Sequence, residues 1–110
     1  MDLAEACYKM TATFPREEIY GMTAQVRRAA SSIAANIAEG YGRETTGSFI
    51  QFLRVAQGST KELETHLLLA SRVGVAKAEE LTPLLVRCER VSKMLRNLIR
   101  SLQREGAAEM

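Results

Sequence analysis

Apolar residues recur at spacings of three and four residues in four separate segments of the chain, which is the period of an amphipathic α-helix. The clearest segment is residues 18–40, whose apolar stripe consists of Met22, Val26, Ala29, Ile33 and Ile37. Similar stripes predict helices over residues 2–13 and 47–73, and from Thr82 up to Gly106. The pattern therefore predicts an all-α protein.

Proline and glycine residues mark the ends of the first two predicted helices. Phe14-Pro15 ends the first helix, because proline disfavours helical geometry in the residue before it. Gly40 and Gly42 are predicted to end the second helix, since glycine adopts the left-handed C-terminal cap most easily. Small residues crowd this second helix, so we expect neighbouring helices to approach it closely.

In the third helix, Thr45 or Thr46 is the expected N-cap and Gly74 the expected end. Gly58 lies inside this helix, where glycine costs about 1 kcal/mol relative to alanine. Such a glycine usually indicates a close helix contact or a bend.

The fourth helix has two candidate starts, Lys77 and Thr82. We favour Thr82, because Pro83 then takes the first helical position, where proline is tolerated. Residues 106–110 are predicted to form a frayed tail.

The connections between these helices are short, so successive helices are expected to lie antiparallel. A chain of 110 residues has room for one domain with a modest core. We therefore predict a single domain over residues 1–110, folded as an antiparallel up-down four-helix bundle that self-associates to cover its apolar surface.

Two strips of polar residues run beside the apolar stripes of the central helices. At about 100° per residue, each strip is about 60–80° wide. The strip on the second helix contains Arg28, Ser32, Asn36, Glu39 and Arg43, and the strip on the third contains Ser59, Glu62 and His66. We interpret the two strips as a structural polar network that fixes helix register or subunit orientation. The alternative is a ligand or catalytic pocket around Glu39, Ser59, Glu62 and His66.

The chain lacks the motifs of common enzyme sites. His66 is its one histidine, the cysteines do not form a CxxC pair, and no HExxH, phosphate loop or nucleophile elbow is present. Glu62 and His66 are four residues apart, whereas di-iron bundles use Glu-x-x-His. We therefore predict no catalytic residues, no metal, no cofactor and no enzymatic activity.

Cys7 and Cys88 do not have the spacing of a disulfide framework, and the N-terminus shows no hydrophobic signal segment. A cytoplasmic location follows as the expectation. No apolar run approaches the ~20 residues of a membrane span, so we expect no membrane association.

The strongest charge feature is the outer face of the fourth helix, opposite its apolar stripe. It carries Arg90, Lys93, Arg96, Arg100 and Arg104, with no acidic residue between positions 90 and 104. Residues 75–105 hold seven cations against four acids, although the whole chain has a net charge of only +2. This face is either a solvated surface or a strip that binds phosphate groups.

From Phe14 to Leu102 the chain resembles the bacterial four helix bundle protein family, also called the 23S ribosomal RNA intervening-sequence proteins. Accessory variability proteins of diversity-generating retroelements are related to this family. The residues that carry the resemblance are Phe14-Pro15, Glu18, Tyr20-Gly21-Met22, Gln25-Val26-Arg27-Arg28-Ala29, Ser32-Ile33, Asn36-Ile37-Ala38-Glu39-Gly40, Arg43, Phe52-Leu53, Gly58-Ser59 and Glu62-Leu63-Glu64.

The resemblance implies a ring-like homo-oligomer, a homopentamer, with a basic surface or channel. In the retroelement relatives that surface is similar to an adaptor for nucleic acid and reverse transcriptase. Two departures from the family pattern stand out. Gln57 replaces an arginine that is usual in the family, and the first helix is expected to be shorter than its counterparts.

These observations favour a non-catalytic, oligomeric protein that binds RNA or DNA, or acts as an adaptor, through the basic face of the fourth helix. Arg27 and Arg43 are lesser candidates for the same role. The alternative is a structural scaffold for a protein partner, such as a reverse transcriptase, without a nucleic-acid role.

Overall fold

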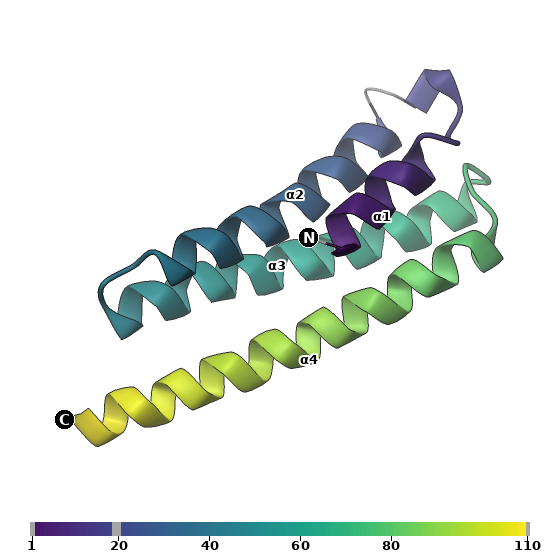
Figure 1. The fold of residues 1–110 in the computed structure, drawn as a ribbon. Coiled ribbons are helices and arrows are strands. Elements are labelled where there is room, and N and C mark those ends of the chain that lie inside the picture. The colour runs from purple at the N-terminus through teal and green to yellow at the C-terminus, as the bar shows by residue number, and fades with distance from the viewer. Residues whose placement is uncertain (1, 19–20, 110) are drawn as a thin grey trace.

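The computed structural model of the protein describes residues 2–18 and 21–109 and contains four α-helices, with no strand among the described residues. The helices are α1 (Asp2–Thr11), α2 (Met22–Tyr41), α3 (Thr46–Arg72) and α4 (Ala78–Glu109), and a short 3-10 helix, η1 (Arg16–Glu18), follows α1 (Figure 1). The prediction of an all-helical chain with four helices is confirmed.

The end of α1 and the start of α2 differ from the prediction, and both helices are shorter there. α1 ends at Thr11, and α2 starts at Met22, four residues after the predicted start. Glu18 belongs to η1, and its Oε2 accepts a hydrogen bond of 3.3 Å from the backbone N–H of Met22. This side chain satisfies a free donor of the first turn of α2, so the helix begins there. Ile19 and Tyr20 belong to the predicted helix, and Tyr20 also to the family resemblance; both residues lie outside the described residues.

The glycines at the end of α2 have a different role from the predicted one. Gly42 is the C-cap but has a right-handed φ of −84°, so the predicted left-handed cap is wrong. Gly40 lies within the helix, where an added Cβ would come within 2.9 Å of Cδ1 of Phe49. Glycine is therefore needed at position 40 for close approach to α3. At the other end of α3 the prediction is confirmed, because Gly74 has a φ of +78° directly after the C-cap Val73.

The preferred start of α4 is wrong, and the earlier alternative lies next to the observed start at Ala78. Pro83 is inside the helix, although proline there costs about 3 kcal/mol. The added first turn buries Leu81 to 1% exposure, and complete burial of a leucine contributes about 2 kcal/mol. The Thr82 hydroxyl also donates to the carbonyl of Ala78 at 3.0 Å.

The helix also continues beyond Gly106 to Glu109, so the described part of the predicted tail is helical. Residue 110 lies outside the described residues.

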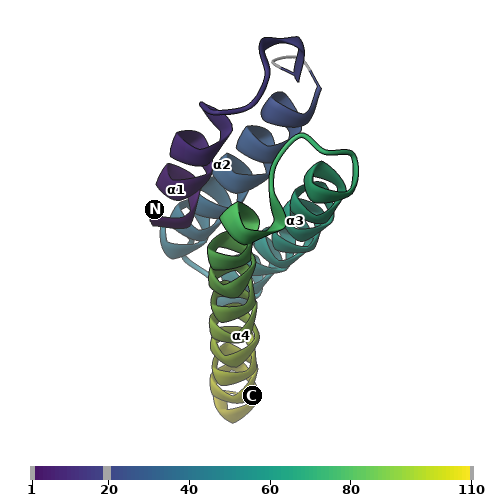
Figure 2. The same ribbon diagram turned by 90° about the vertical axis from the view of Figure 1, so that its right-hand side faces the viewer.

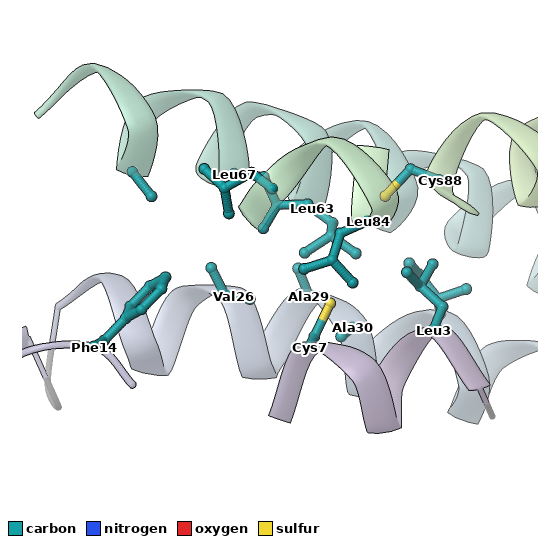
Figure 3. Packing of buried hydrophobic residues seen from close by; sticks show 13 residues of the cluster. Leu3, Cys7, Phe14, Val26, Ala29, Ala30, Leu63, Leu67, Leu84 and Cys88 are labelled. Atoms are coloured by element: carbon teal, nitrogen blue, oxygen red, sulfur yellow. The ribbon is translucent and has the colours of Figure 1, made fainter. Parts of the chain in front are cut away.

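Two clusters of buried side chains hold the helices together. The larger one joins all four helices and includes Leu3, Cys7, Val26, Leu63 and Leu84 (Figure 3). The smaller one contains Leu53, Ala56, Leu95 and Ile99 and involves only the α2, α3 and α4 part of the molecule. The bundle thus contains four helices along only part of its length, and α1 is absent from the rest.

The short α1 explains this asymmetry. Ten residues span about 15 Å, whereas the 32 residues of α4 span about 48 Å. α1 packs between α2 and α4, whose described backbones do not contact each other (Figures 1 and 2). Past the start of α1 an apolar groove of about 260 Å³ opens between α2 and α4, and its lining includes Ala34, Ile37, Val91 and Met94. We call these four residues and the space between them the open groove.

Candidate nucleic-acid interface

The five predicted cations of α4 are all exposed, on the side of the helix away from the core. The buried residues of this helix, such as Cys88, Leu95 and Ile99, face α3 and the rest of the bundle. From Arg90 to Arg104 the charges extend over about 21 Å of helix. They are Arg90, Lys93, Arg96, Arg100 and Arg104.

Few acids neutralise this face. Lys93 Nζ lies 3.7 Å from Glu89 Oε1, and both side chains are about two-thirds exposed, so solvent weakens the attraction. Within the described residues, none of the four arginines of this face forms an ion pair. Their guanidinium groups are available to an external anion.

The structure adds two cations that the sequence analysis did not consider. Arg54 and Lys61 of α3 line the same depression as Arg96 of α4, together with Gln57, Gly58 and Ser92. The depression has a volume of about 400 Å³. Arg54 and Lys61 are seven residues apart and so lie on one helix face, a signal present in the sequence. Only the packing of α3 against α4 shows that this face adjoins Arg96. We call the five cations of α4 with Arg54 and Lys61 the basic surface.

The predicted polar strips make contact at one point. Ser32 Oγ of α2 and Ser59 Oγ of α3 are 2.8 Å apart. Asn36 Nδ2 donates to the backbone carbonyl of Ser32 at 2.8 Å and to Ser32 Oγ at 3.1 Å. Ser59 is 8% exposed, so its hydroxyl depends on this partner. Ser32, Asn36 and Ser59 therefore form one small cluster between the two helices.

The other residues of the strips make separate contacts. Arg43 pairs with Glu39 at 2.8 Å, and its guanidinium lies over the ring of Phe52, 4.5 Å from the centroid. His66 Nε2 lies 3.6 Å from Glu62 Oε1, too far for a hydrogen bond, and this buried nitrogen has no other partner among the described residues. Arg28 is exposed and makes no hydrogen bond or ion pair within the described chain.

Arg27, a lesser candidate for nucleic-acid contact, is engaged within the protein. Its Nε donates to Thr11 Oγ1 at 2.9 Å, and one terminal nitrogen donates to the carbonyl of Tyr8 at 3.3 Å. The guanidinium also lies 4.8 Å from the centroid of the Tyr8 ring. Arg27 therefore ties α1 to α2, and Arg43 is similarly occupied by Glu39 and Phe52.

The two cysteines are poor nucleophiles. Burial raises the pKa of the Cys7 thiol to about 11, and burial, with smaller effects of Cys7 and Glu64, raises the pKa of Cys88 to about 12. Both thiols are free and fully buried in the larger cluster (Figure 3). A thiol of such high pKa stays protonated at neutral pH, where thiolate chemistry is therefore weak.

Among the described residues, no group of three or more histidine, cysteine, aspartate or glutamate side chains is placed to hold a metal ion. In the same part of the chain, none of the helices has the length and apolar character needed to cross a membrane.

Comparison with known proteins identifies relatives of this arrangement. The family described as "23S rRNA-intervening sequence protein" matches residues 1–97. A similar solved structure comes from Bacteroides thetaiotaomicron VPI-5482 and is described as a protein with unknown function from the S23 ribosomal protein family. Its sequence is 25% identical, the match covers 89% of this chain and 92% of that one, and the TM-score is 0.80. No curated protein matches the chain. Because the family match spans most of the sequence, the chain belongs to the 23S rRNA-intervening sequence protein family.

Proposed function

We propose that the protein is a non-catalytic nucleic-acid-binding or adaptor protein that acts through the basic surface. The observation that carries the proposal is the convergence of Arg54, Lys61 and Arg96 from two helices on one depression. Exposed cations on one surface attract the phosphate backbone, and their binding releases counterions from the nucleic acid. This charge-driven binding does not require a particular base sequence.

Self-association is the second part of the proposal. The exposed large hydrophobic side chains include Tyr41, Leu68, Val73 and Met94, all at least 50% exposed, and Met94 lines the open groove. Covering such surfaces with further copies of the chain removes apolar area from water. We propose a ring-like homo-oligomer, a pentamer in line with the family resemblance, which repeats the basic surface around its axis.

The assembly is tested by light scattering coupled to gel filtration. The expected mass is several times 12.2 kDa. A monomer at micromolar concentration would contradict the ring.

The proposed location is the cytoplasm, where a reducing environment suits two free thiols.

Fluorescence anisotropy with labelled RNA and DNA oligonucleotides tests the binding function. The affinity is expected to fall steeply with salt, with a slope of about 0.9 per phosphate contact for duplex DNA. Arg96→Glu with Arg100→Glu should remove binding. The matched control is Arg16→Glu with Arg72→Glu, which changes net charge equally at exposed sites outside the basic surface. Absence of binding at low salt, or affinity that does not respond to salt, refutes the function.

The second candidate function is a scaffold for a protein partner, and the exposed apolar side chains favour it. A reverse transcriptase is one such partner in the related retroelement proteins. The same charge-reversal variant separates the two functions. A protein partner that binds equally to this variant and to the original chain, with nucleic-acid binding absent in both, supports the scaffold.

A further inference from the structure

Gly58 lies near the middle of α3, where glycine is less favourable than alanine. A glycine inside a helix usually indicates a close helix contact or a bend. A Cβ built on Gly58 meets no atom within 4 Å, in contrast to Gly40, where it comes within 2.9 Å of Phe49. Gly58 also lacks the positive φ that favours glycine, and α3 is unbroken from Thr46 to Arg72. Packing and backbone geometry within the chain therefore do not account for this glycine.

The surroundings of Gly58 are cationic. Arg54 lies one helical turn before it, Lys61 lies about one turn after it, and Arg96 reaches the same depression from α4. The remaining lining residues, Gln57 and Ser92, are neutral donors and acceptors, and the lining contains no acid. Lys61 has a weak ion pair with Glu64 at 3.8 Å, with the lysine three-quarters exposed. A group that comes close to the helix backbone at Gly58 therefore enters a positive environment.

We propose that Gly58 forms the floor of a phosphate seat, in which a phosphodiester of the nucleic-acid backbone lies among Arg54, Lys61 and Arg96. This inference rests on the proposed nucleic-acid function and places its central contact. The missing side chain leaves room for the phosphate against α3. The two arginines offer paired N–H donors, Lys61 adds a compact charge, and the Ser92 hydroxyl is a further donor.

The composition of the surface supports contact with phosphates rather than bases. From residue 53 onward the chain contains no phenylalanine, tyrosine or tryptophan. Stacking on aromatic rings is the usual way in which proteins hold unpaired bases without sequence preference. The basic surface lies wholly in this part of the chain, so its contacts are charge and hydrogen bonding to the backbone.

The experiment fills the seat with side chains of increasing size. Gly58→Ala and Gly58→Leu are compared with Gly47→Ala and Gly47→Leu, because an added Cβ at Gly47 also meets nothing within 4 Å and Gly47 does not line the depression. The probes are a labelled 20-nucleotide RNA and a 20-base-pair DNA duplex at low salt. We expect Gly58→Leu to weaken binding about tenfold, Gly58→Ala to weaken it less, and the Gly47 variants to bind normally.

The outcomes separate the seat from the function on which it rests. If the original chain binds and Gly58→Leu binds equally well, the seat is wrong and the proposed function stands. If the original chain does not bind at low salt, both are wrong. If light scattering shows that the Gly58 variants form a smaller assembly, Gly58 contacts another copy and the seat is wrong. Gly58→Ala, which adds one methyl group and favours the helix, keeps the comparison valid if Gly58→Leu fails to fold.

Discussion

The hydroxyl oxygens of Ser32 and Ser59 lie 2.8 Å apart and join α2 to α3 through side chains beside the core. The bond helps to fix the register of α2 against α3, the two antiparallel helices that residues 42–45 connect. Asn36 supports it from the next turn of α2, with bonds to both the carbonyl and the hydroxyl of Ser32. A hydrogen-bonded pair of this kind constrains helix alignment more strictly than apolar contacts, which tolerate sliding.

Removal of the buried member of this pair should destabilise the protein. Ser59→Ala is expected to lower the free energy of unfolding by about 1 kcal/mol, because it removes the bond between the two hydroxyls and leaves Ser32 Oγ with Asn36 as its remaining partner. Denaturant unfolding measures this value. The Ser32→Ala, Ser59→Ala double variant should be less destabilised than the sum of the single variants. Additive effects would show that the two hydroxyls do not interact, and an unchanged stability of Asn36→Leu would contradict a structural role for the cluster.

Neighbouring arginines of α2 should respond differently to substitution. Arg27→Ala removes the bonds to Thr11 and Tyr8 and is expected to cost about 1–2 kcal/mol. Because these bonds hold α1, its amides should exchange hydrogen faster in the variant. Arg28→Ala is the control, since Arg28 is exposed and has no partner in the described chain, and it should change stability by less than about 0.5 kcal/mol. An equal loss of stability in the two variants would show that Arg27 does not hold α1 against α2.

Glycine-to-alanine substitutions should act in opposite directions at two sites. Gly40→Ala forces a Cβ against the Phe49 ring at 2.9 Å and is expected to cost about 1–3 kcal/mol. Gly58→Ala meets no atom and is expected to add up to about 1 kcal/mol through helix propensity. Thermal unfolding monitored by circular dichroism compares the two. Destabilisation by Gly58→Ala would mean that its surroundings are more crowded than the structure shows.

The buried thiols predict a loss of stability at high pH. The pKa values of Cys7 and Cys88 are raised in the folded state to about 11 and about 12, from 9.0 in the absence of these effects. Below pH 9 both states keep the thiol protons, so this contribution is fully present. Above pH 9 the unfolded state loses them first, and the free energy of unfolding should fall by up to about 1.4 kcal/mol per thiol per pH unit until the folded pKa is passed.

The measurement is urea unfolding between pH 8 and 10.5, with Cys7→Ala and Cys88→Ala together as the control for other titrating groups. The free energy of unfolding of this double variant should fall less steeply with pH than that of the original chain. Alkylation at pH 8 should likewise be slow in the folded protein and fast in urea. Rapid alkylation of the native protein would contradict the burial of these thiols. So would a free energy of unfolding that falls equally with pH in the variant and in the original chain.

Much of the fold was predictable because helix periodicity is local. The predicted third helix differs from α3 by one residue at each end, since Thr45 and Gly74 provide a cap and a left-handed stop. The exposed face of α4 follows from the same period. The start of α4 was not predictable in this way, because burial of Leu81 by other helices and the hydrogen bond from Thr82 to the carbonyl of Ala78 together offset the local cost of Pro83.

The pattern of residues along the chain specifies that the protein is helical, where most helices run and which face of each is apolar, because these properties depend on residues three and four apart. Which of these faces meet depends on the packing of the helices in the folded protein. That packing placed Arg54 and Lys61 beside Arg96, engaged Arg27 in hydrogen bonds while leaving Arg28 exposed, and left open space where a side chain of residue 58 would begin. The short α1 also leaves part of the bundle with only three helices. The physical reason is that contacts between helices depend on their packing and relative length, which no local pattern of residues specifies.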